Sequence, residues 1–211
     1  PDGVGAWDVG VEGERIAAVA LPGTLPTSSA RVIDAAGKIV APGGVEPHAH
    51  LAHGIMSHPD APSQTLGPEE DTVGMACGGT TTHIDFAYLR TGGNLQQVVE
   101  QRAVRWKGNS YVDYTFHITL AGALDLQVFE QIPEAIQAGY PSFKVFTTNV
   151  LPPHPKRAGN RLDFGRIHYA MEKVAPAGGI MVVHGEDEDL VQFNYERFRE
   201  EKPMEGENLH L

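Results

Sequence analysis

The pattern of apolar and polar positions changes in character near residue 42. Before that point, short alternating or β-branched runs are separated by turn signals at Gly13, Pro22-Gly23 and Ala36-Gly37. Such runs predict strands, and they show no helical period. The expected strands are 6–11, 15–20, 31–34 and 38–40. Residues 1–42 are therefore expected to form a small β unit.

After Pro42-Gly43, strand-like apolar runs alternate with stretches of helical period, as between residues 126 and 138. The expected strands are 44–50, 80–88, 111–120, 142–148 and 180–185, and the expected helices are 68–77, 95–107, 126–138, 164–174 and 186–201. Strand–helix units in series predict right-handed crossovers and a parallel sheet. Because no glycine-rich dinucleotide turn follows a strand, the pattern favours a (β/α) barrel over a doubly wound sheet.

Composition narrows the class of protein. The 211 residues are 41% hydrophobic and 20% charged, as in an ordinary globular protein, and the net charge of −11 argues against a nucleic-acid partner. No apolar run approaches the roughly 20 residues of a membrane span, so no membrane partner is expected. The single cysteine, Cys77, excludes an internal disulfide and fits a reducing cytoplasm. We expect Cys77 to be a small core residue.

Histidines and a lysine fall where the expected strands end, and in a (β/α) barrel the chemistry lies at the carboxyl ends of the strands. His48 and His50 are two residues apart, so a strand would present both imidazoles on one side, as in a zinc site. A surface or hydrogen-bonded histidine pair is the alternative. The other polar residues near expected strand ends are Asp85, His117, Thr119, Lys144 and His184.

Lys144 lies inside the apolar run Ser142-Phe143-Lys144-Val145-Phe146. Burying its charge is unfavourable unless the amine is paired or modified. One interpretation is a lysine that is salt-bridged or extends its amine to solvent. The other is an amine carbamylated by carbon dioxide, which becomes an anion able to bridge two metal ions about 3.5–4 Å apart.

Four segments, in one order along the chain, carry a wider pattern. They are residues 34–50, ending in Pro-His-Ala-His, residues 78–87 (Gly-Gly-Thr-Thr-Thr-His-Ile-Asp-Phe-Ala), residues 142–146 (Ser-Phe-Lys-Val-Phe) and residues 183–187 (Val-His-Gly-Glu-Asp). Together they resemble the amidohydrolase superfamily over essentially the whole chain. Within it, the chain is most similar to the cyclic amidohydrolases, which are hydantoinase and dihydropyrimidinase, with dihydroorotase and allantoinase as relatives.

This resemblance implies a partial (β/α)8 TIM-type barrel in residues 43–211, about five of its eight units. Residues 1–42 would then be part of a small β-sandwich domain. His48 and His50 would bind the more buried of two divalent ions, most simply Zn²⁺, and His184 would bind the second. Lys144, carbamylated by carbon dioxide, would bridge the two ions.

The resemblance also implies an activity, the metal-dependent hydrolysis of a cyclic amide such as hydantoin or a dihydropyrimidine. The partner would be that small-molecule substrate, and the full-length protein would be a cytoplasmic homo-oligomer. The family completes its site with a histidine on strand six and a proton-transferring aspartate on strand eight. Neither strand is expected before Leu211, so we expect this chain to be an N-terminal part that is inactive alone.

The chain departs from the family pattern at two places. A tyrosine usually stands five residues beyond the lysine, and here Asn149 does, whose amide is expected to bind substrate. Ala52 and His53 replace the aspartate that commonly follows the histidine pair. His53 and His58 are expected either to line the substrate mouth or to lie in a solvated loop.

Two other functions stay open. One is hydrolysis of a linear amide or carbamoyl substrate on the same fold, and the other is a non-catalytic scaffold protein related to dihydropyrimidinase. The presence of all four expected ligands favours the enzyme. Of the remaining polar residues, His83, Asp85 and His117 are expected to make hydrogen bonds in the core or behind the site. The acidic residues 186–189 are expected to stabilise the start of a helix.

Overall fold

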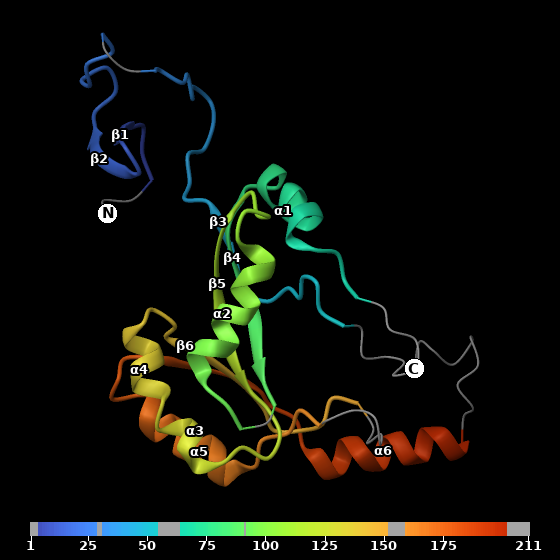
Figure 1. Ribbon diagram of the computed structural model, residues 1–211. Helices are drawn as coiled ribbons and strands as arrows, with labels where there is room; N and C mark the ends of the chain where they lie inside the picture. The colour runs from blue at the N-terminus through green and yellow to red at the C-terminus, as the bar shows by residue number, and fades with distance from the viewer. Residues whose placement is uncertain (1–3, 29–30, 55–63, 91, 152–158, 202–211) are drawn as a thin grey trace. The chain divides into compact units, whose positions relative to one another are not determined.

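The computed structural model describes residues 4–28, 31–54, 64–90, 92–151 and 159–201 (Figure 1). The chain divides into two compact units, Pro1–Pro42 and Gly43–Leu211. The first contains a two-stranded antiparallel sheet, and the second contains a five-stranded parallel sheet with its helices.

The sheet of the N-terminal unit is the hairpin of β1 (Asp8–Glu12) and β2 (Arg15–Ala20). Gly13, in the turn between them, has a positive φ of 60°, which glycine adopts without strain. Two of the four expected strands therefore form. Within the described residues, this hairpin is the part of the expected β-sandwich that is present.

The prediction of strands at residues 31–34 and 38–40 was wrong. A turn lies between them instead, in which the Asp34 carboxylate accepts a hydrogen bond from Ala36 N (2.9 Å). Ile39 is 94% exposed. A β-branched run becomes a strand only where a neighbouring strand pairs with it, and the described residues of this unit provide none for this segment.

The second unit is built on parallel strands that lie side by side in chain order. They are β3 (Gly44–Glu46), β4 (Thr80–Leu89), β5 (Asp113–Leu120), β6 (Ser142–Phe146) and β7 (Ile180–His184). A doubly wound sheet would reverse its strand order, whereas this order winds in one direction as in a barrel. The five strands thus form part of a TIM-type barrel, which confirms the predicted fold class.

Helices connect these strands at nearly the expected positions (Figure 1). They are α1 (Pro68–Cys77), α2 (Leu95–Trp106), α3 (Leu126–Phe129), α4 (Ile132–Gln137), α5 (Phe164–Val174) and α6 (Glu188–Glu201). None of the helices among the described residues is both long and apolar enough to cross a membrane.

The helix expected over 126–138 is broken in two after Phe129. Pro133 lacks the N–H that would continue the first helix, and it is tolerated in the first turn of a new one. Accordingly, α4 begins at Ile132 with Pro133 in its first turn. Phe129 and Ile132 of the predicted apolar face are buried, but Leu126 is 58% exposed, and the proline divides the element.

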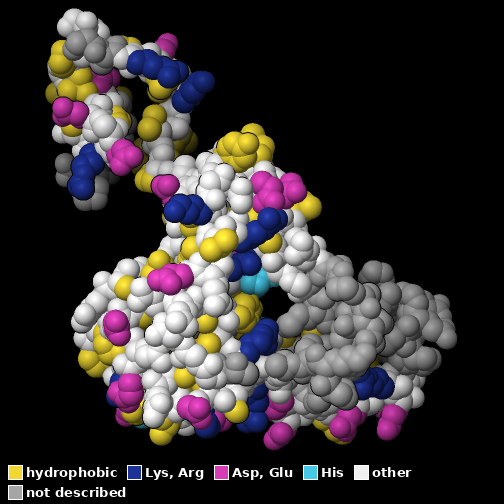
Figure 2. Space-filling model, in the orientation of Figure 1, with side chains coloured by type: hydrophobic (Ala, Val, Ile, Leu, Met, Phe, Trp, Pro, Cys, Tyr) yellow, Lys and Arg dark blue, Asp and Glu magenta, His cyan; other side chains and the backbone are white. Residues whose placement is uncertain are grey.

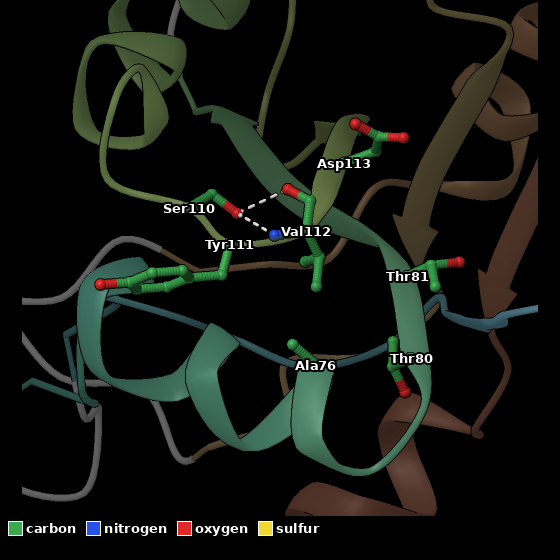
Figure 3. Close-up of a pocket in the computed structure, with 7 residues that line it drawn as sticks. All are labelled: Ala76, Thr80, Thr81, Ser110, Tyr111, Val112 and Asp113. Carbon is green, nitrogen blue, oxygen red and sulfur yellow. Dashed lines mark hydrogen bonds between the residues drawn. The ribbon is translucent and has the colours of Figure 1, made fainter. Parts of the chain in front are cut away.

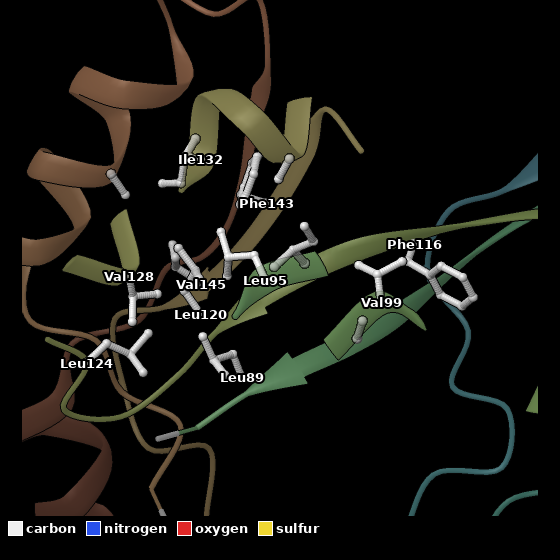
Figure 4. Close-up of a cluster of buried hydrophobic side chains, with 14 of the residues drawn as sticks. Leu89, Leu95, Val99, Phe116, Leu120, Leu124, Val128, Ile132, Phe143 and Val145 are labelled. Carbon is white, nitrogen blue, oxygen red and sulfur yellow. The ribbon is translucent and has the colours of Figure 1, made fainter. Parts of the chain in front are cut away.

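Helices α2 to α5 pack on one face of the sheet through a single apolar core. Figure 4 shows Phe116, Leu120, Phe143 and Val145 of the strands against apolar side chains of α2, α3 and α4, and their buried partners are Leu95, Val99, Val128 and Ile132. Cys77, expected in this core, is exposed at the end of α1, so that prediction was wrong. The periodicity of this short helix was too weak to reveal which of its faces is buried.

The opposite face of the sheet carries the polar residues. Neighbouring residues of a parallel pair point to the same side. The pairs Phe86 with His117, Thr119 with Lys144, and Phe146 with His184 therefore share one face. Asp85 and Val145, one residue away along their strands, point to the helices. Strand alternation alone thus gathers the candidate site on the face away from the core.

A hollow of about 310 Å³ opens at the amino-terminal ends of β4 and β5 (Figure 3). Its lining consists of Ala76, Thr80, Thr81, Ser110, Tyr111, Val112 and Asp113. The Ser110 hydroxyl is bonded to the backbone of Val112 in the same lining. The hollow therefore lies at the opposite end of the strands from the carboxyl ends, where the candidate histidines are.

Candidate metal-binding site

His48 and His50 lie on a loop and not on a strand, because β3 ends at Glu46. The prediction that this strand extends to residue 50 was wrong, since Pro47 follows Glu46 and cannot donate a hydrogen bond to a sheet. The two rings nevertheless lie side by side in an edge-to-face arrangement, with centroids 5.6 Å apart. Both rest on Phe86, whose ring stacks on His50 at 4.3 Å and lies 5.2 Å from His48.

Burial keeps both imidazoles in their neutral form. Desolvation, with the charges of neighbouring His53 and His48, lowers the pKa of His50 to about 4. Desolvation followed by the charge of Lys144 lowers the pKa of His48. A neutral imidazole is the form that binds a metal ion, so the pair is ready to act as ligands at neutral pH.

Lys144 is buried and unpaired. Its side chain is 3% exposed, and its amine lies 5.0 Å from the centroid of the Phe146 ring. Among the described residues, no group hydrogen-bonds or forms an ion pair with this amine. Burial lowers the pKa of Lys144. The salt-bridged interpretation of this lysine therefore has no support in the described part of the chain.

A second orphan polar group lies beside this lysine. The Thr119 hydroxyl is completely buried and has no hydrogen-bond partner within the described residues. Thr119 is the register neighbour of Lys144 on β5. A buried hydroxyl without a hydrogen-bond partner destabilises the folded protein by about 1–3 kcal/mol. A hydrogen-bond acceptor on this face of the sheet would remove that cost. A carbamate on Lys144 would bring acceptor oxygens to this face.

His184 ends β7 on the same face, and its charge contributes to the lowered pKa of His48. However, its Nε2 lies 2.9 Å from Glu186 Oε2, so this atom is already engaged. Across the described ranges, no three or more His, Cys, Asp and Glu side chains form a group that could hold a metal ion. The structure thus brings His48, His50 and Lys144 together, whereas His184 is drawn towards Glu186.

The donor set still fits a metal centre in its chemistry. Neutral imidazoles are ligands for Zn²⁺, and the carbamate of a buried lysine would supply the anionic oxygens that the histidines lack. Lys144 is not a metal ligand until it is modified. The binding role of these four residues therefore stays a prediction.

Asn149 is held within a network of loop contacts. Its Nδ2 donates to Glu188 Oε1 (2.9 Å), and its Oδ1 accepts from the backbone N–H groups of Asn160 (2.9 Å) and Arg161 (3.1 Å). These bonds join the loop after β6 to the start of α6. They give Asn149 a structural role, and substrate binding through its second amide hydrogen stays a prediction.

The other polar residues near the expected strand ends make structural contacts. His117 bonds to Pro47 O and Ser142, as expected of a residue behind the site. His83 is completely buried and stacks on Trp106, as expected of a core residue. Asp187 accepts a hydrogen bond from Leu190 N (2.8 Å), as expected at the start of α6, whereas Glu186 and Glu188 bond to His184 and Asn149 instead.

His53 is not a free residue of a solvated loop, and its ring lies 5.2 Å from that of His50. Its Nε2 is 3.0 Å from Oδ1 of the fully buried Asp85, and Asp85 also binds Arg102 and Trp106 of α2. Arg102 was not predicted from the sequence. The one signal in the sequence is its position: it is a charged residue on an otherwise apolar stripe of α2, three residues before Arg105. His58 lies outside the described residues.

Charged side chains are mixed over the visible face of the parallel-sheet unit. Figure 2 shows acidic and basic groups interspersed there, with a histidine reaching the surface among them.

No protein-family model matches the chain. Individual proteins do match it. The D-hydantoinase of Rhizobium radiobacter is 31% identical over 197 residues, which are 93% of this chain and 40% of that enzyme. The dihydropyrimidinase of Rattus norvegicus is 29% identical over 162 residues, 76% of this chain and 29% of that protein.

Solved structures of D-hydantoinase and dihydropyrimidinase also match the chain. A D-hydantoinase structure superposes with a TM-score of 0.77 at 30% identity, covering 95% of this chain and 40% of that one. Dihydropyrimidinase from Brevibacillus agri NCHU1002 superposes with a TM-score of 0.76 at 27% identity, covering 92% and 40%.

The partial parallel barrel and the polar residues on its open face place the chain in the class of TIM-barrel amidohydrolases. More particularly, the chain is hydantoinase-like, as the motifs indicated. It spans about 40% of the length of the D-hydantoinases that it matches.

Proposed function

We propose that the protein containing this chain hydrolyses the ring amide of a cyclic amide, such as hydantoin or a dihydropyrimidine, with the help of two divalent metal ions. The observation that carries the proposal is Lys144, a buried and unpaired amine beside two neutral histidines. The similarity to D-hydantoinase over 93% of the chain supports the substrate class.

In this proposal His48 and His50 would hold one ion, His184 would hold the second after leaving Glu186, and the carbamate of Lys144 would supply anionic oxygens to both. Zn²⁺ is the simplest choice for histidine and carbamate ligands. When bound, such ions lower the pKa of water and polarise a carbonyl group. The protein would act in the cytoplasm as a homo-oligomer. The single cysteine of this chain fits the reducing conditions of that compartment.

The residues of this chain prepare the centre in two ways. Burial lowers the pKa of Lys144, which raises the fraction of neutral amine at a given pH. The neutral Nζ can attack the carbon of carbon dioxide; an N–C bond forms while one C=O π bond opens and its electron pair moves to oxygen. The nitrogen then loses one proton to water, and a carbamate anion results. Phe86, which stacks on His50 and lies tilted against His48, keeps both imidazoles oriented and shielded on one side.

Proton transfer to the leaving nitrogen is assigned to residues outside this chain, so we propose that the 211 residues alone do not turn over substrate. Asn149 is kept as a secondary candidate for contact with the substrate carbonyl. Its bonds to Glu188 and the 160–161 backbone make it a fixed group at the end of β6.

The test is a substrate panel with the intact protein that contains this chain. The panel consists of hydantoin, dihydrouracil, dihydroorotate, allantoin and a linear N-carbamoyl amino acid. Turnover of a cyclic amide that a chelator abolishes and Zn²⁺ restores supports the proposal. Turnover of the linear compound alone changes the substrate class. A folded protein without bound metal and without turnover is a scaffold, and overturns the proposal.

A further inference from the structure

The loop that carries His48 and His50 is fixed by side chains from two other elements. Before the pair, His117 Nε2 of β5 donates to Pro47 O (2.9 Å). After the pair, Arg102 of α2 donates to Leu51 O and, at 3.3 Å, to Ala52 O. The backbone is thus held on both sides of the two histidines, although β3 has already ended.

Each of these side chains is itself oriented by a buried partner. His117 Nδ1 lies 2.5 Å from Ser142 Oγ. Because Nε2 must carry the proton that it gives to Pro47 O, Nδ1 accepts from the Ser142 hydroxyl, and the tautomer is fixed. Ser142 is on β6, two residues before Lys144 and on the same face. The hydrogen bonds of His117 therefore connect the histidine loop to the strand of the lysine.

Arg102 is oriented by the carboxylate of Asp85. Arg102 Nε donates to Asp85 Oδ2 at 2.7 Å, and Trp106 Nε1 donates to the same oxygen at 2.8 Å. His53 Nε2 is 3.0 Å from Oδ1, so both carboxylate oxygens are bound. The rigid guanidinium fork then places its remaining donors on the carbonyls that follow His50.

We propose that His117 and Arg102, the latter held by Asp85, are positioning residues that set the separation and direction of the His48 and His50 imidazoles and bring them to Lys144. This inference rests on the proposed function, in which the two histidines bind metal. A ligand pair on an unsupported loop must be ordered when the metal binds, and that ordering reduces affinity. The two contacts remove this penalty by ordering the loop beforehand.

The test compares matched variants of the intact protein that contains this chain. His117→Phe keeps the ring beside Phe86 but removes the hydrogen bonds, whereas His117→Gln keeps a donor for Pro47 O. Arg102→Met removes the fork, and Arg102→Lys keeps only a single cation beside Asp85. The control is Arg105→Met on the same helix, where the arginine pairs with Glu69 at the surface.

Three measurements are made on each variant. These are the affinity for Zn²⁺, the visible absorption spectrum of the Co²⁺-loaded protein, and amide hydrogen exchange of residues 47–54 without metal. We expect His117→Phe and Arg102→Met to bind Zn²⁺ about tenfold more weakly, with an altered Co²⁺ spectrum and faster exchange. His117→Gln should recover to within about threefold of the parent, and Arg105→Met should match it.

The outcomes separate this inference from the proposed function. If the parent binds Zn²⁺ and the folded variants bind it equally well with an unchanged spectrum, the positioning role is wrong and the metal site stands. If the parent binds no Zn²⁺, the proposed function fails and this inference fails with it. If His117→Gln binds Zn²⁺ as weakly as His117→Phe, loss of the hydrogen bond to Pro47 O is not the reason for the weaker binding. Should Arg102→Met fail to fold, Arg102→Lys decides the arginine contacts.

Discussion

Asp85 and Arg102 form an ion pair between the sheet and α2, with Oδ2 and a terminal guanidinium nitrogen 2.5 Å apart and the carboxylate fully buried. A charge buried in this way is tolerated only when it is paired and hydrogen-bonded. Asp85 meets this condition through His53, Arg102 and Trp106 together. This pair is therefore a point on which the stability of the barrel unit depends.

We predict that Asp85→Asn lowers the free energy of unfolding by about 3–5 kcal/mol, because it leaves the guanidinium of Arg102 without its buried counter-charge. Urea denaturation followed by circular dichroism measures the change. Asp113→Asn, an exposed aspartate at the start of the next strand, is the matched control and should change stability by less than about 0.5 kcal/mol. Equal effects of the two substitutions would contradict this account of the ion pair.

The same pair predicts how stability depends on pH. Burial works to raise the pKa of Asp85, but the hydrogen bond and charge of His53 and the charge of Arg102 outweigh it and lower that pKa. The stabilisation is then complete above the unfolded-state pKa of about 3.9 and is lost as pH falls through the folded-state value. The stability difference between the parent and Asp85→Asn should therefore shrink as the pH is lowered from 5 to 2. A difference that stays constant over this range would show that ionisation of Asp85 is not its source.

Thr119→Val tests the orphan hydroxyl beside Lys144. Valine has nearly the same shape but no hydroxyl, so the metal-free protein should be as stable as the parent or up to about 1–3 kcal/mol more stable. If the hydroxyl binds a carbamate on Lys144, the same variant should retain less metal at a given concentration of bicarbonate. Thermal unfolding and elemental analysis measure the two effects. Reduced stability without metal would mean that Thr119 has a partner of another kind.

Asn149→Ala separates a structural from a substrate-binding role. Loss of the bonds to Glu188 and to the Asn160 and Arg161 backbone should lower the unfolding free energy by about 1–3 kcal/mol. A purely structural residue leaves KM unchanged in the fraction of protein that is folded. A raised KM together with unchanged stability would instead support the predicted contact with substrate.

The fold was predictable because it depends on patterns that are local in the sequence. Strand-like apolar runs that alternate with helical stretches gave the chain order of the parallel sheet. Where the prediction failed, a single residue or a missing neighbour was responsible. Pro47 ends β3 before the histidines, Pro133 divides the helix over 126–138, and the β-branched residues near Ile39 have no strand to pair with in the described part of their unit.

The candidate site was predictable in part. Residues at strand ends were found because strand alternation and the barrel rule place them together, and Thr119, Lys144 and His184 do share one face. His48 and His50 lie on a loop, where their rings contact Phe86 of the same face. The contacts of His53 and Arg102 with Asp85 join residues 32 and 17 positions away in sequence. No periodic pattern encodes such contacts, because they depend on how a loop and a helix pack against the sheet.

The most direct test of the central claim is the metal content of Lys144→Ala in the intact protein, compared with Lys173→Ala. Lys173 is a surface residue paired with Glu130 on the same unit, and so controls for the loss of a lysine. We predict that Lys144→Ala loses bound metal and amide hydrolysis together, that a short carboxylic acid partly restores both, and that Lys173→Ala retains both. Full metal content and activity in Lys144→Ala would contradict the bridging role of Lys144 and the metal centre built on it.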